Sequence, residues 1–129
     1  MARAAGALRT ERDYTEIEIV TLFRSRAQIL CPAVSIVGIP NAAKRSQWAA
    51  MQAKREGMAT GFPDILCLWD GPGIAALEFK TAKGKLSDNQ AEWLERLNRM
   101  GFPATVVRSA DEALAFLERC GAPFVGRVG

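Results

Sequence analysis

The spacing of apolar residues changes from helical to strand-like within the first forty positions. Over 14–30 the apolar residues recur mostly at three- and four-residue intervals, which predicts a helix with one inward stripe. That stripe contains Glu16, Ile19, Val20, Phe23, Ala27 and Leu30. Pro32 ends this helix, because the residue before a proline avoids helical dihedral angles. The next segment, 33–39, is short, β-branched and apolar, and it predicts a strand.

The middle of the chain predicts a second helix and a hairpin. Residues 41–56 have a helical pattern, and Gly57 is placed as the C-terminal stop of that helix. Two apolar runs, 64–69 and 74–80, predict strands that are joined by the turn-forming residues at 70–73.

Capping patterns mark the helices of the last third. Ser87 stands three residues before Gln90, a capping-box spacing that opens a helix running to Met100. A short strand is expected at 104–108. The same spacing recurs at Ser109, which opens a last helix that a glycine ends.

The elements therefore follow the order α-β-α-β-β-α-β-α. Strands interleaved with helices imply an α/β fold, in which a central mixed β-sheet is flanked by helices. With 129 residues, the chain is long enough for one buried core and too short for two. We expect the domain to span 12–120, with a flexible N-terminus over 1–11 and a loose tail over 121–129.

Composition narrows the class of protein. The chain has no histidine, which removes Ser-His and Cys-His nucleophiles, His-bound zinc and histidine general bases. Its three cysteines are far apart and odd in number, which argues against a disulfide framework or zinc site and favours a reducing, cytoplasmic compartment. No apolar run is long enough to cross a membrane, and the N-terminus has no apolar signal region. The net charge of +3 is compatible with a polyanionic partner but does not require one.

A chain of this composition would have to catalyse hydrolysis with carboxylates, lysine and a hard metal ion. The predicted hairpin contains the carboxylates and the lysine for such a site. Side chains alternate across a strand, so Glu78 and Lys80 share one face. If the hairpin loop begins after Leu68, that residue pairs with Ile74, and Asp64 then falls opposite Glu78. A loop that begins one residue later would send Asp64 to the other face. We expect the longer loop or a compensating bulge.

Facing carboxylates repel one another, and a divalent cation reverses the sign of the interaction. Oxygen-only ligands select Mg²⁺, with Mn²⁺ as a substitute, over zinc. Such an ion lowers the pKa of bound water and stabilises negative charge on a phosphoryl oxygen. The ammonium of Lys80 is suited to holding the attacking water. An exposed Glu78–Lys80 ion pair, with Asp64 simply following a turn, is the alternative explanation.

Three further features favour a site over an exposed ion pair. Glu16 lies on an apolar stripe, where an unpaired carboxylate is costly, although acids also favour the first turn of a helix. Gln90 shares the inward stripe of its helix, although the capping box explains it equally well. The segment Gly61-Phe62-Pro63-Asp64 presents an acid directly after a rigid turn, at the start of a strand.

In combination, these residues resemble the VRR-NUC branch of the PD-(D/E)xK nucleases over roughly 12–118. The matching pieces are Glu16, Asn41, Gly61-Phe62-Pro63-Asp64, Glu78-Phe79-Lys80 and Gly84-Lys85-Leu86-Ser87 with Gln90. One departure is Ala42-Ala43, where the family often has a glycine after the asparagine.

The resemblance implies a restriction-endonuclease-like core that hydrolyses DNA phosphodiester bonds with Mg²⁺. The metal ligands that it implies are Asp64, Glu78, Phe79 through its backbone carbonyl, and Glu16. Lys80 would orient or activate water, and Gln90 would complete the catalytic set. Glu18 is the competing acid on the first helix, although it lies off the main apolar stripe.

The small stand-alone phage and bacterial members of this family resemble homodimeric Holliday-junction resolvases, so the resemblance implies a homodimer that acts on branched DNA. Candidate phosphate contacts are Lys44, Arg45, Lys54, Arg55, Lys83 and Lys85, although a solvated surface charge explains each of them singly. The alternatives are a flap, single-strand or nicking nuclease of the same fold, or a catalytically silent DNA-binding module.

Overall fold

The computed structural model describes residues 9–40, 48, 51–52 and 60–125. Its elements are η1 (Glu11–Asp13), α1 (Glu16–Leu30), β1 (Ser35–Gly38), β2 (Ile65–Trp69), β3 (Gly73–Phe79), α3 (Asp88–Arg99), β4 (Ala104–Val107) and α4 (Ala110–Arg119). The helix expected over 41–56 lies outside the described residues, apart from 48 and 51–52, which are helical.

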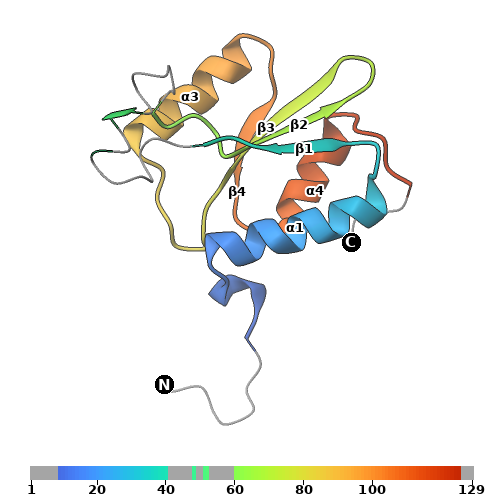
Figure 1. Ribbon diagram of the computed structural model, residues 1–129, viewed down its shortest axis with the longest axis horizontal. Coiled ribbons are helices and arrows are strands. Elements are labelled where there is room, and N and C mark those ends of the chain that lie inside the picture. Colours follow the sequence, from blue (N-terminus) through green and yellow to red (C-terminus); the bar gives the residue numbers. More distant parts are fainter. Residues whose placement is uncertain (1–8, 41–47, 49–50, 53–59, 126–129) are drawn as a thin grey trace.

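The described strands form one sheet in the order β1-β2-β3-β4. β2 is antiparallel to both β1 and β3, whereas β3 and β4 are parallel. The α/β class with a central mixed sheet is therefore confirmed. Helices α1 and α4 lie together beside the sheet, and α3 lies apart from them at the other side (Figure 1).

The side chains of β3 alternate between two apolar clusters. Phe79 belongs to the larger cluster, which α1 and α4 cover, and its ring centroid lies 5.4 Å from that of Phe23. Ala76 belongs to the smaller cluster, together with Leu97 of α3. The alternation of side chains puts Glu78 on the same face as Ala76, toward α3.

The hairpin has the predicted register, because Leu68 pairs with Ile74. The ladder continues for one more pair, Trp69 with Gly73, so the loop proper is shorter than expected and spans 70–72. A Cβ atom at Gly73 would lie 1.9 Å from Nε1 of Trp69, so the indole covers this position and requires glycine. The turn and the covering tryptophan together fix which residues of β2 and β3 face each other.

Helix α1 begins two residues later than the apolar pattern predicted. Thr15 is its N-cap, and its side chain accepts a hydrogen bond from Glu18 N at 3.2 Å. Glu18 Oε1 in return accepts from Thr15 N at 2.9 Å, which completes a capping box. Tyr14 and Thr15 are extended and connect α1 to the short 3₁₀ helix η1, which precedes them.

The described part of the N-terminal segment, which we expected to be flexible, contacts two helices. Arg9 donates to both carboxylate oxygens of Glu18, at 2.8 and 2.9 Å. Glu11 Oε1 accepts from the backbone N–H of Ala110 at 2.6 Å, at the N-terminus of α4. These contacts attach residues 9–11 to the rest of the domain.

The pairing with Arg9 predicts a dependence of stability on pH. Hydrogen bonds from Arg9, and then from the Thr15 backbone, lower the pKa of Glu18 from 4.5 to about 2. Because the folded pKa is depressed, this carboxylate stabilises the fold above pH 4.5, and the contribution is lost as pH falls toward 2. We expect Arg9→Gln to make the urea midpoint fall less steeply between about pH 5 and 3. Arg12→Gln is the control, and identical slopes for wild type and Arg9→Gln would contradict the assignment.

The chain after α4 also packs on the domain, where a loose tail was expected. Ala122 is buried, and the backbone N–H of Val125 donates to Leu30 O at 2.7 Å. Phe124 packs against the larger apolar cluster. Residues 122–125 therefore cover the end of α1.

Candidate active site

Asp64 lies directly before β2, at the end of the hairpin away from its turn. The last pair of the ladder joins Ile65 to Leu77, and continuing this register by one pair places Asp64 opposite Glu78. Asp64 Oδ2 accepts a hydrogen bond from the backbone N–H of Phe79 at 3.1 Å. The N–H and C=O groups of one strand residue point to the same side, so the Phe79 carbonyl also faces Asp64. One carboxylate and one carbonyl thus meet at this edge.

Glu78 is fully buried and is held by Gln90 of α3. Gln90 Nε2 donates to Glu78 Oε2 at 3.1 Å, while Gln90 Oε1 accepts from the backbone N–H of Ser87 at 2.9 Å. Ser87 Oγ in turn accepts from Gln90 N at 3.1 Å. The capping role and the inward role, which the sequence offered as alternatives, are therefore both filled by one side chain.

The two acids near the start of α1 have different surroundings. Glu16 lines a cavity of about 300 Å³ together with Asp64 and Phe79. Glu18 is engaged by Arg9 and by the N-cap Thr15. Of the two alternatives that the sequence left open, Glu16 is the acid that shares a cavity with Asp64.

Lys80 directly follows β3 and is half-buried. The backbone N–H of Lys80 donates to Val107 O at 3.0 Å, so the extended backbone of β3 continues to this residue. Because side chains alternate along an extended strand, the side chain of Lys80 lies on the same face as that of Glu78. The turn that follows is held from inside by Arg108, whose Nη1 donates to Thr81 O at 2.7 Å and to Gly84 O at 2.6 Å. Arg108 thereby fixes the course of the chain just beyond the lysine.

Comparison with known protein families identifies the family of this chain. The family model of the VRR-NUC domain matches residues 8–111. The chain belongs to the VRR-NUC family. A solved structure named "VRR_NUC domain protein" superposes with a TM-score of 0.67 at 20% sequence identity, and the match covers 87% of this chain and 89% of that chain, which shows the same fold. The search of curated proteins found no match.

VRR-NUC domains are nuclease domains of the PD-(D/E)xK superfamily and are generally metal-dependent. A metal ion in this domain would be bound by side-chain or backbone oxygen atoms near Asp64. Within the described residues, no three His, Cys, Asp or Glu side chains are gathered as a metal-binding group. Mg²⁺ keeps several waters and is commonly held by only one or two carboxylates. Asp64 with the Phe79 carbonyl, and Glu16 in the same cavity, are oxygen donors of the kind it prefers. These oxygen donors are of the kind that a hard divalent ion such as Mg²⁺ accepts.

Cysteine chemistry has no part in this VRR-NUC site. All three cysteines are free thiols. Burial raises the pKa of Cys67 to about 12, and burial also raises the pKa of Cys31 and Cys120. These thiols stay protonated at neutral pH and are poor nucleophiles.

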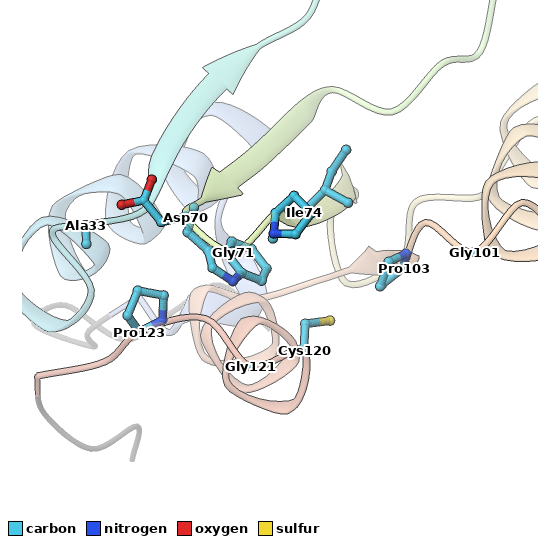
Figure 2. A pocket seen from close by; sticks show the side chains of 12 residues that line it. Ala33, Asp70, Gly71, Ile74, Gly101, Pro103, Cys120, Gly121 and Pro123 are labelled. Atoms are coloured by element: carbon cyan, nitrogen blue, oxygen red, sulfur yellow. The ribbon is translucent and has the colours of Figure 1, made fainter.

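Another cavity lies at the opposite end of the sheet. It has a volume of about 670 Å³ and is enclosed by the hairpin turn, the segment before β4 and the residues after α4 (Figure 2). Among its described lining residues only Asp70 is charged. Gly73 and Glu78 stand five residues apart on β3, roughly 17 Å at strand spacing. This cavity is therefore remote from Glu78, and among the lining residues that the structure describes it offers a single carboxylate.

Several predicted DNA contacts are not placed by the structure. Lys44, Arg45, Lys54 and Arg55, together with Asn41 and its Ala42-Ala43 departure, lie outside the described residues. Lys83 and Lys85 are exposed on the loop after Lys80. No helix in the described part of the chain has the length and apolar character needed to span a membrane.

Two arginines near the site were not found from the sequence. Arg24 lines the cavity of Glu16 and Asp64, two helical turns along α1. The spacing of eight residues between Glu16 and Arg24 is a helical-face signal that could have indicated it. Arg108 binds backbone carbonyls more than twenty residues away in sequence, and no local pattern announces such a contact.

The double role of Gln90 predicts an effect on both stability and cleavage. Gln90→Leu removes the cap acceptor and the buried hydrogen bond to Glu78, and we expect a loss of about 2–4 kcal/mol in unfolding free energy. Cleavage should fall by about 10- to 100-fold, since a side chain that orients a ligand is lost.

Ser87→Ala is the matched control, because it removes only the other half of the capping box. It should cost about 1 kcal/mol and leave cleavage near the wild-type rate. Urea denaturation and a DNA cleavage assay measure the two effects. Equal losses for the two variants in both assays would mean that Gln90 is only a cap.

Proposed function

We propose that this protein is a Mg²⁺-dependent DNA endonuclease that hydrolyses phosphodiester bonds in branched DNA, such as Holliday junctions. Membership of the VRR-NUC family supports the nuclease class. The observation that carries the proposal is the hydrogen bond from Phe79 N to Asp64 Oδ2, in a hairpin whose register, continued by one pair, sets Asp64 across from Glu78. No histidine is available anywhere in the chain as an alternative base.

Each residue of the proposed site has a role that its surroundings support. Asp64, Glu16, Glu78 and the Phe79 carbonyl would hold the ion, which when bound supplies a water of lowered pKa and a positive charge near the phosphoryl oxygens. Lys80, on the face of Glu78, orients the attacking water and offsets the charge that builds up on the phosphate. Gln90 holds the Glu78 carboxylate in one orientation. Burial of Glu78 excludes water from that side of the site.

The substrate is proposed to be held by basic side chains around the site. Lys83 and Lys85 are exposed on the loop that begins at Lys80, where a DNA backbone would pass. A junction has two symmetric strands to cut, so a two-fold homodimer would present two sites in matching orientation. A stable monomer in light scattering at micromolar concentration, alone and with junction DNA, would contradict the dimer.

The test is cleavage of a panel of DNA substrates with Mg²⁺ or Mn²⁺. Four-way junction, flap, single-stranded, linear duplex and supercoiled plasmid DNA would be compared at equal concentration. We expect cleavage of the junction to be fastest. Preference for flap or single-stranded DNA, or nicking of the plasmid alone, would support the proposed nuclease activity but contradict the proposed substrate. Tight binding without cleavage of any DNA would instead assign a silent DNA-binding module.

A further inference from the structure

The cavity beside the candidate site has one basic side chain among its described lining residues. Glu16, Ile17, Val20, Thr21 and Arg24 of α1 form one wall of this cavity, and Asp64, Ile65 and Phe79 form the other. The cavity thus presents two acids and a guanidinium around a volume of about 300 Å³. The two acids suit a cation, and the guanidinium suits negatively charged oxygens, so the cavity suits a ligand such as a metal-bound phosphate.

The position of Arg24 is set by the end of β1. Its Nη1 donates to Ile36 O at 3.3 Å, which is long for a hydrogen bond of this type. A Cβ atom at Gly38 would lie 3.5 Å from Nη2, which is ordinary van der Waals contact, so the guanidinium lies directly beside this residue of the strand. A guanidinium has five N–H donors, and one carbonyl uses only one of them. The side chain is exposed, so its donors are within reach of a ligand.

The charges around the cavity favour a basic side chain as the group that binds phosphate there. Asp64 and Glu16 repel a phosphate, and the attraction of a bound metal ion weakens with distance, so it is greatest for the phosphate that the ion touches. Arginine binds phosphate through paired N–H donors and is preferred at such positions. Lys80 lies on the face of Glu78, whereas Arg24 approaches from α1 on the other side of the sheet.

We propose that Arg24 binds a phosphate of the DNA backbone next to the one that is cleaved. This assignment rests on the proposed nuclease function and adds the path of the substrate to it. The DNA strand enters across the face of α1 formed by Ile17, Thr21 and Arg24, passes Asp64 and leaves along the loop of Lys83 and Lys85. The alternative is that Arg24 only secures β1 through Ile36, and a binding experiment separates the two.

The experiment measures DNA affinity as a function of salt in EDTA, with the cleavage site disabled by Asp64→Asn. The dissociation constant for a four-way junction would be determined between about 50 and 200 mM salt. Arg24→Gln should reduce the slope of log affinity against log salt by about 1, because one phosphate contact is lost. Affinity at about 0.1 M salt should fall about 5- to 10-fold. Arg24→Lys keeps the charge and should keep the slope.

Arg26→Gln is the matched control, because Arg26 lies on the same helix and pairs with Asp111 of α4. It should leave the slope unchanged. An unchanged slope in Arg24→Gln, an equal reduction in Arg26→Gln, or a reduction in Arg24→Lys as large as in Arg24→Gln would each overturn the phosphate contact. Failure of the parent protein to bind DNA at all would instead overturn the proposed function.

Discussion

Replacing Asp64 with asparagine is expected to lower the rate of DNA cleavage by about 1,000-fold, which corresponds to about 4 kcal/mol of transition-state stabilisation. The amide oxygen of asparagine can still accept the hydrogen bond from Phe79 N, which wild-type Asp64 accepts at 3.1 Å. The charge is lost while this contact is kept, so the variant separates metal binding from folding. Single-turnover cleavage of junction DNA with Mg²⁺ measures the effect.

The control for this variant is Asp70→Asn, an identical change on the exposed hairpin turn at the far end of β2. It should cleave at the wild-type rate. DNA affinity in EDTA should not fall in either variant, because without a metal ion the carboxylate of Asp64 repels phosphate and Asp70 lies at the other end of the strand. Cleavage by Asp64→Asn within tenfold of the wild-type rate would remove Asp64 from the site.

The largest expected effect on stability comes from Phe23→Ala. Phe23 is fully buried, and its ring packs 5.4 Å from that of Phe79, which joins α1 to the strand that carries Glu78. Truncation of a buried phenylalanine costs about 3–5 kcal/mol. For a chain of this size, the melting temperature should fall by roughly 10–20 °C. Calorimetry or thermal circular dichroism measures the shift.

Ile29→Ala provides the comparison on the same helix, because Ile29 is 72% exposed. Its effect should stay within about 0.5 kcal/mol, as for other surface substitutions. Similar shifts for the two variants would mean that α1 does not rest on the sheet through Phe23. Cleavage by folded Phe23→Ala below its melting temperature should also be reduced, since Glu16 and Arg24 are carried by α1.

The apolar pattern alone left two registers of the hairpin open. The register expected from the need to bring Asp64 opposite Glu78 is the one observed, because Leu68 pairs with Ile74. The apolar pattern did not decide whether Glu16 or Glu18 is the metal-site acid of the first helix. The capping box of Thr15 and Glu18 is a local pattern, and its recognition would have separated Glu18 from Glu16.

Other parts of the site depend on contacts that have no local pattern. Arg108 recognises carbonyl oxygens of Thr81 and Gly84, and carbonyls are present at every residue, so sequence cannot identify the pair. The hydrogen bond from Val125 N to Leu30 O, at the end of α1, has the same character, because both of its partners are backbone groups. Contacts to the main chain are therefore where the sequence prediction was weakest.

The side chain of Gln90 connects the first turn of a helix to a buried acid, and this limits what evolution can place there. A substitute must offer an acceptor to Ser87 and a donor to Glu78 from the same length of chain. Glutamate supplies only the acceptor, leucine and methionine lack the amide donor, and asparagine is one carbon shorter. Natural variation at position 90 should consequently be narrow, and any relative without an amide there should carry a compensating change next to its buried acid.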